Sequence, residues 1–79
     1  MNLPRDIDAS KLIKALRKLG YETTRQTGSH IRLTTQQNGQ QHLTIPNHDP
    51  LRIGTLNAIL TEVAQHFGVS KQELVERLF

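Results

Sequence analysis

The sequence predicts a small α+β domain, in which helices cover one face of a three-stranded antiparallel sheet in the order α-β-β-β-α-α. Apolar residues recur at helical spacing near both ends of the chain. Between these two stretches they alternate with polar residues, as in strands with one buried face. With 79 residues, the chain is expected to form one domain, residues 1–79, with a small core.

The first helix is predicted from Asp8 to Leu19. Asp8 is a suitable N-cap, because its carboxylate can accept hydrogen bonds from the free amides of the first turn. Gly20 is expected to end the helix in the left-handed conformation. The apolar stripe consists of Leu12, Ile13, Leu16 and Leu19. The opposite side carries three lysines, Lys11, Lys14 and Lys18.

Three extended segments are predicted in the middle of the chain, at residues 21–27, 30–35 and 41–46. The first is rich in threonine, and Gly28-Ser29 separates it from the second. The second and third alternate apolar with polar residues. Because Asn38-Gly39 lies between them, these two segments are expected to form a hairpin.

The register of this hairpin follows from the requirement that its buried face be apolar. A two-residue loop would pair Leu33 with Thr44, whereas the three-residue loop 37–39 pairs Leu33 with Leu43. We therefore expect a type I turn followed by a bulge, with Gly39 in the left-handed conformation. The polar face then carries His30 (beside Pro46), Arg32, His42 and Thr44.

Two further helices are predicted in the last third of the chain. The first starts at about residues 53–55 and runs to Phe67, with the strongest apolar periodicity in the sequence, and Gly68 ends it. The last helix is expected from Lys71 to Phe79. The run Ser70-Lys71-Gln72-Glu73 is a capping box for its start.

Composition and charge limit the classes of function. Residues 1–39 hold seven basic and three acidic residues, whereas residues 40–79 hold three and four. A basic half favours a polyanionic partner such as nucleic acid, although a solvated surface explains it as well. The absence of Cys excludes a disulfide framework and Cys-ligated zinc. Neither a membrane helix nor a signal peptide is recognisable, so a soluble cytoplasmic domain is expected, with no membrane partner.

His30 is the sharpest candidate for a catalytic group. It follows Gly28-Ser29 on the polar face near Arg32, and an imidazole can take or give a proton near neutral pH. Cleavage of RNA needs a base for the ribose 2′-OH and cations for the phosphate. On spacing alone, a solvated strand histidine is the stronger reading. Ser29 is not expected to contact the imidazole, because neighbours on a strand point to opposite faces.

Other polar residues are weaker candidates for metal or phosphate binding. His42, His48 and Asp49 lack a familiar metal-binding spacing, so no metal site is predicted. His66 is attributed to the favourable dipole at a helix end. Arg52, near the start of the second long helix, could add to the attraction of its free amides for an anion. The three lysines of the first helix either follow a phosphate backbone or solubilise the helix.

One segment offers a different function. Ala64–Ser70 has the spacing of a helix-turn-helix motif, whose recognition helix would be Lys71–Phe79. That helix carries as many acidic as basic side chains, so it offers no net attraction to phosphate. DNA binding through this segment is therefore the least favoured function, behind RNA cleavage and non-catalytic RNA binding.

Two runs of residues resemble the HicA toxin family, and the resemblance extends from about Ile7 onward. The first run includes Leu12-Ile13-Lys14-Ala15-Leu16 and Arg25-Gln26-Thr27-Gly28-Ser29-His30. The second includes Ile45-Pro46-Asn47-His48 and the helix start Gly54-Thr55-Leu56-Asn57-Ala58-Ile59-Leu60. The Gly-Ser-His triplet is short, but in combination with this helix start it is fairly specific for the family.

The resemblance implies a fold similar to double-stranded-RNA-binding domains. It also implies a small toxin that cleaves mRNA without a cofactor and blocks translation, and a HicB-like antitoxin that covers the active site. The catalytic histidine of the family corresponds to His30, and His48 is a weaker candidate. Ile31 stands where many members carry a second histidine, so the general acid is left open between water and Arg32. We expect RNA to be bound by Lys11, Lys14, Lys18, Arg25, Gly28, Ser29 and Arg32, with Arg52 as a secondary candidate.

Overall fold

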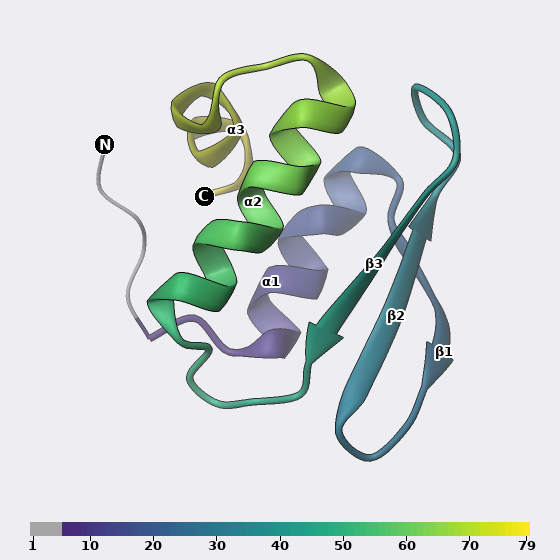
Figure 1. The fold of residues 1–79 in the computed structure, drawn as a ribbon, viewed down its shortest axis with the longest axis vertical. Coiled ribbons are helices and arrows are strands. Elements are labelled where there is room, and N and C mark those ends of the chain that lie inside the picture. Colours follow the sequence, from purple (N-terminus) through teal and green to yellow (C-terminus); the bar gives the residue numbers. More distant parts are fainter. Residues whose placement is uncertain (1–5) are drawn as a thin grey trace.

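Three antiparallel strands in the order β1-β2-β3 form a sheet that is covered by helices on one face (Figure 1). The computed structural model describes residues 6–79. The predicted α+β class and element order are confirmed. The elements are α1 (Ala9–Leu16), a 3₁₀ turn (Arg17–Leu19), β1 (Glu22–Gln26), β2 (His30–Thr35), β3 (Gln41–Pro46), α2 (Ile53–Phe67) and α3 (Lys71–Leu78).

Helix α1 begins and ends with the predicted capping residues, but its last turn is tighter than predicted. The Asp8 carboxylate accepts the first-turn amide of Lys11 at 2.8 Å. The α-helix ends at Leu16, and residues 17–19 continue as a 3₁₀ turn, which is common at helix ends. Gly20 has φ 81°, and a Cβ there would lie 2.7 Å from the Gln37 side chain. The left-handed backbone at this position therefore favours glycine, and a larger residue would also have to displace the exposed Gln37 side chain.

The β2–β3 hairpin has the predicted register. Leu33 pairs with Leu43, and His30 pairs with Pro46, so one face is apolar and the other polar. The turn between the strands differs from the type I turn expected. Asn38 (φ 55°) is left-handed as well as Gly39 (φ 94°).

The end of α2 contacts this turn. His66 Nε2 donates to the carbonyl oxygens of Gln37 and Gly39, each at 2.9 Å. In return, the Asn38 side-chain amide donates to the His66 carbonyl at 2.8 Å. His66 therefore holds the hairpin turn onto the helix, a role that the helix-dipole interpretation did not include.

Strand β1 is shorter than predicted and contains a bulge. The register with β2 shifts between Thr23 and Arg25, and beyond the bulge Arg25 pairs with Arg32. The bulge places Arg25 on the polar face, opposite Arg32. Tyr21, which was expected in the strand, precedes it and is fully buried, with its hydroxyl hydrogen-bonded to the Gln41 side chain. Burial raises the pKa of Tyr21 to about 12.

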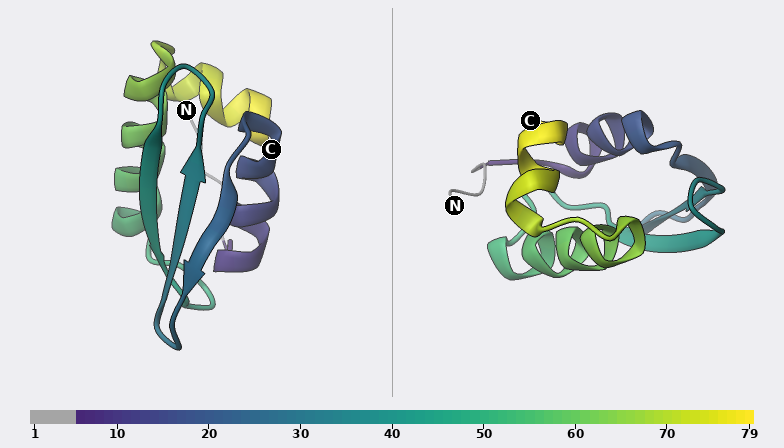
Figure 2. Two further views of the ribbon diagram at one scale, coloured as in Figure 1. Left: turned by 90° about the vertical axis from the view of Figure 1, so that its right-hand side faces the viewer. Right: turned by 90° about the horizontal axis from the view of Figure 1, so that it is seen from above.

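The core lies between the sheet and the two long helices. Figure 2 shows α1 and α2 on the same side of the sheet, so the opposite face is open. The first turn of α2 does not share in this core, because Ile53 is 51% exposed and the buried stripe starts at Leu56. The fully buried side chains at the centre include Leu12, Leu16, Leu33, Leu43, Ile45 and Leu60.

Helix α3 packs on the other helices through Leu74 and Leu78. Ser70 caps it by accepting the Glu73 amide at 3.1 Å, as the capping box predicts. At its C-terminal end, the Lys18 ammonium donates to the Leu78 carbonyl at 3.0 Å. Within the described residues, no helix has the length and apolar character needed to cross a membrane.

Candidate active site

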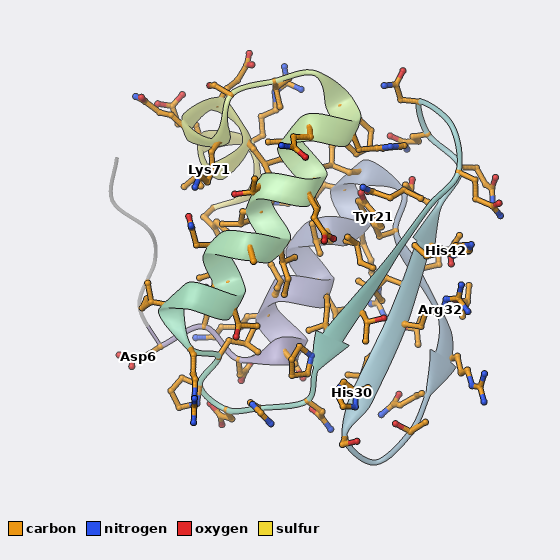
Figure 3. The ribbon with its side chains drawn as sticks, in the orientation of Figure 1. Asp6, Tyr21, His30, Arg32, His42 and Lys71 are labelled. Atoms are coloured by element: carbon orange, nitrogen blue, oxygen red, sulfur yellow. The ribbon has the colours of Figure 1, made fainter. Side chains whose placement is uncertain are left out.

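The open face of the sheet gathers polar side chains from all three strands. In Figure 3, Arg32 and His42 extend away from the helices, and His30 lies at the start of β2. Arg25, His30, Arg32, His42 and Thr44 are exposed. This face therefore offers a broad surface, not an enclosed pocket.

A tight turn between β1 and β2 sets the position of His30. The Thr27 amide donates to the His30 carbonyl at 2.9 Å, and the His30 amide donates to the Thr27 hydroxyl at 3.1 Å. The Ser29 carbonyl accepts the Asn47 amide at 2.9 Å. His48 follows Asn47 directly, and its carbonyl accepts a hydrogen bond from the Ala9 amide at 3.3 Å. The turn is therefore tied, through the loop after β3, to the start of α1.

The prediction that Ser29 does not contact the imidazole is wrong. Ser29 Oγ lies 2.9 Å from His30 Nδ1, within hydrogen-bond distance. The alternation of faces applies only inside a strand, and β2 begins at His30, one residue after Ser29. Nothing else among residues 6–79 hydrogen-bonds to this ring, so Nε2 remains accessible to a substrate.

Two arginines face each other beside His30. Arg25 and Arg32 are direct cross-strand partners, and both are exposed. Like charges directly opposite each other destabilise a sheet. Neither arginine forms an ion pair within residues 6–79, where Glu73–Arg77 is the single salt bridge. An anionic ligand would supply the missing counter-charge.

A row of hydrogen bonds crosses the face farther from the turn. Thr34 Oγ1 lies 3.0 Å from Thr24 Oγ1 and 2.8 Å from His42 Nδ1. The row thus joins all three strands and orients the His42 ring. The described residues contain no group of three His, Asp or Glu side chains able to hold a metal ion, so His42, His48 and Asp49 do not form one.

The structure separates the predicted RNA-binding residues into two sets. Arg25, Gly28, Ser29 and Arg32 lie around His30 on the open face or its bordering turn. Lys11 and Lys14 belong to α1 and Lys18 to the 3₁₀ turn after it, and both elements lie on the helix side of the sheet (Figure 2). Lys18 is also engaged at the end of α3. His48 is exposed in the loop after β3, and exposed Arg52 precedes α2 without capping it.

The helix-turn-helix spacing reflects how α3 is attached to α2. Gly68 is left-handed (φ 66°), and Ser70 caps the next helix. The exposed side of that helix carries the ion pair Glu73–Arg77, at 3.3 Å. Capping and packing account for these residues without DNA.

Comparison with known proteins assigns the chain to a family. The family model described as "HicA toxin of bacterial toxin-antitoxin" matches residues 9–64, from α1 to the last third of α2, and includes Gly28-Ser29-His30. No curated protein and no solved structure matches the chain. The molecule is thus a toxin of a toxin–antitoxin system. Specifically, the chain belongs to the HicA toxin family, and membership implies a HicB-like antitoxin as its partner.

Proposed function

We propose that this protein is a metal-independent endoribonuclease that cleaves mRNA and so blocks translation, with His30 as its catalytic residue. One observation carries the proposal: Ser29 occupies Nδ1 of His30, while Nε2 is free on a face with two unpaired arginines. An accessible imidazole beside fixed cations is the minimum needed to cleave RNA at its 2′-OH.

In the proposed cleavage reaction, His30 acts as the base and the two arginines as cations. His30 Nε2 accepts the proton of a ribose 2′-OH, and the 2′ oxygen attacks the adjacent phosphorus. The bond from phosphorus to the 5′ oxygen breaks, and that oxygen takes a proton from water. Arg25 and Arg32 stabilise the negative charge on the phosphate as it increases. Arg32 acts as a cation and not as the acid, because a guanidinium does not lose its proton in proteins.

The proposed ribonuclease activity also has an expected cellular location and inhibitor. The residues act within a single domain and without a cofactor, and we place the reaction in the cytoplasm, where mRNA is translated. The HicB-like antitoxin would stop cleavage by covering the open face, since the exposed His30 is unprotected there. The likeness to double-stranded-RNA-binding domains stays a prediction.

The experiment that tests the function is cleavage of a single-stranded RNA by the purified protein in excess chelator. We expect products that end in a 2′,3′-cyclic phosphate and a 5′-OH. A matched strand with 2′-deoxyribose throughout should stay intact. Binding of RNA without cleavage would contradict the proposal and favour a non-catalytic RNA-binding module, and activity lost with the chelator would contradict metal independence.

Ser29→Ala tests how His30 is oriented. When Nδ1–H donates to Ser29 Oγ, Nε2 carries the lone pair that accepts the proton. Losing this hydrogen bond should lower kcat about tenfold, while KM changes little. Ser29→Thr retains the hydroxyl and should keep most of the activity. Single-turnover and steady-state kinetics would measure both variants, and an unchanged kcat for Ser29→Ala would contradict the assigned orientation.

A further inference from the structure

A groove lies on the helix side of the sheet, where α1 runs beside the edge strand β1. The groove has a volume of about 470 Å³. Ile31 of β2 and Asn47 after β3 line it together with residues of α1 and β1. Sites for small ligands have volumes of roughly 300–1,000 Å³. The groove is therefore large enough for a molecule of the size of a nucleotide.

The polar side chains of this groove are not used by the fold. All six are exposed, and none hydrogen-bonds to any other group within residues 6–79. They are Ser10, Lys14, Arg17, Thr23, Gln26 and Asn47. Some polar side chains elsewhere are paired within the fold, as the hydrogen bonds of His66 and the row at Thr34 illustrate. Six polar side chains that line one concave surface are therefore available to a ligand.

The chemistry of the lining matches a nucleotide. Lys14 and Arg17 supply two positive charges for a phosphate on the wall formed by α1 and the 3₁₀ turn after it. Gln26 and Asn47 carry side-chain amides, which both donate and accept and so suit the edge of a base. Ile13 and Ile31 supply apolar surface for the face of the base.

The groove adjoins the catalytic turn. Gln26 immediately precedes the turn, and Asn47 donates its backbone amide to the Ser29 carbonyl. Gly28 lies in the turn, and a Cβ there would meet nothing within 4 Å. An RNA strand can therefore pass over Gly28 from the groove to the open face, where His30 stands.

We propose that this groove binds one nucleotide of a single-stranded RNA, next to the phosphate at which His30 acts. Lys14 and Arg17 hold its phosphate, and Gln26 and Asn47 select its base. The inference rests on the proposed function. It makes Arg17 an RNA-binding residue, and it gives Lys14 a role that does not depend on the open face.

The test measures RNA affinity in His30→Ala protein, so that the RNA is not cut. The probes are four single-stranded homopolymers of A, C, G and U, about 12 nucleotides long. Lys14→Gln with Arg17→Gln should weaken all four by about tenfold or more. This double variant should also reduce the salt slope by about 0.7 for each charge removed. Gln26→Ala with Asn47→Ala should change the order of preference among the four.

Arg77→Gln is the control for loss of charge, because it removes one positive charge from an exposed residue outside the groove, and its effect is compared with that of the double variant per charge removed. The proposal is overturned if both double variants bind all four RNAs as the His30→Ala protein does. That result would point to the antitoxin as the partner of the groove. Wild-type cleavage of the same RNAs is measured in parallel, so failure of the groove proposal is distinguishable from failure of the catalytic one.

Discussion

His30→Ala is expected to reduce RNA cleavage by about 10²–10⁴-fold, because the substrate loses the base that accepts its 2′-OH proton. The fold should be unaffected, since the His30 side chain is exposed and its backbone hydrogen bonds to Thr27 do not depend on the imidazole. Cleavage rates and thermal unfolding of the purified variant measure both effects. In a bacterial host, induced wild-type protein should arrest growth and deplete mRNA, whereas the variant should do neither.

His42→Ala provides the matched control for this prediction. His42 is also an exposed histidine of the open face, but it lies away from the catalytic turn, and its Nδ1 is hydrogen-bonded to Thr34. Its loss should leave most of the cleavage rate intact. Equal activity of folded wild-type and His30→Ala proteins would overturn the catalytic assignment, as would a loss of activity that is larger in His42→Ala.

Replacing Arg25 and Arg32 with glutamine should change stability and activity in opposite directions. Relief of the repulsion between directly opposed charges is expected to stabilise the fold by about 0.2–1 kcal/mol. Cleavage should fall by about 10²-fold, because the phosphate loses the cations that stabilise its increasing charge. Denaturant unfolding and initial cleavage rates of the double variant measure the two changes.

The single variants sharpen this prediction. Arg25→Gln and Arg32→Gln should each relieve the repulsion fully, since either change removes one of the two charges. Their effects on cleavage should differ, because Arg32 lies on the same strand as His30 and Arg25 lies on the edge strand. A double variant that is less stable than the wild type and equally active would show that the pair serves the fold.

Much of this fold could be predicted because local rules determine it. The requirement for one apolar face fixed the pairing of Leu33 with Leu43, and a one-residue slip would have exposed the whole buried set. Asp8, Gly20 and Ser70 cap their helices as expected, since capping depends on neighbours within one turn. His30 was likewise placed correctly on the polar face by strand alternation.

The features that sequence reasoning missed depend on contacts between distant segments. An Asn-Gly pair accepts left-handed backbone at both positions, but the contact that holds Asn38 against His66, 28 positions away, has no sign in the local sequence. The bulge at residues 23–25 has no local signal such as a glycine. The Ser29–His30 contact depends on the position of the first residue of β2, and strand ends are the least certain part of a sequence-based prediction.

The backbone ties of the catalytic turn have a consequence for protein synthesis. Ser29 is held by Asn47, and the neighbouring His48 is held by Ala9. The turn between Thr27 and His30 is therefore anchored to the body of the domain only after the ribosome has made the chain beyond residue 48 and released it from the exit tunnel. A nascent chain carrying only the helix and the hairpin lacks this anchor. The position of the turn that carries His30 is thus set only once the loop after β3 has folded against it, so it is a property of the whole domain and not of the hairpin alone.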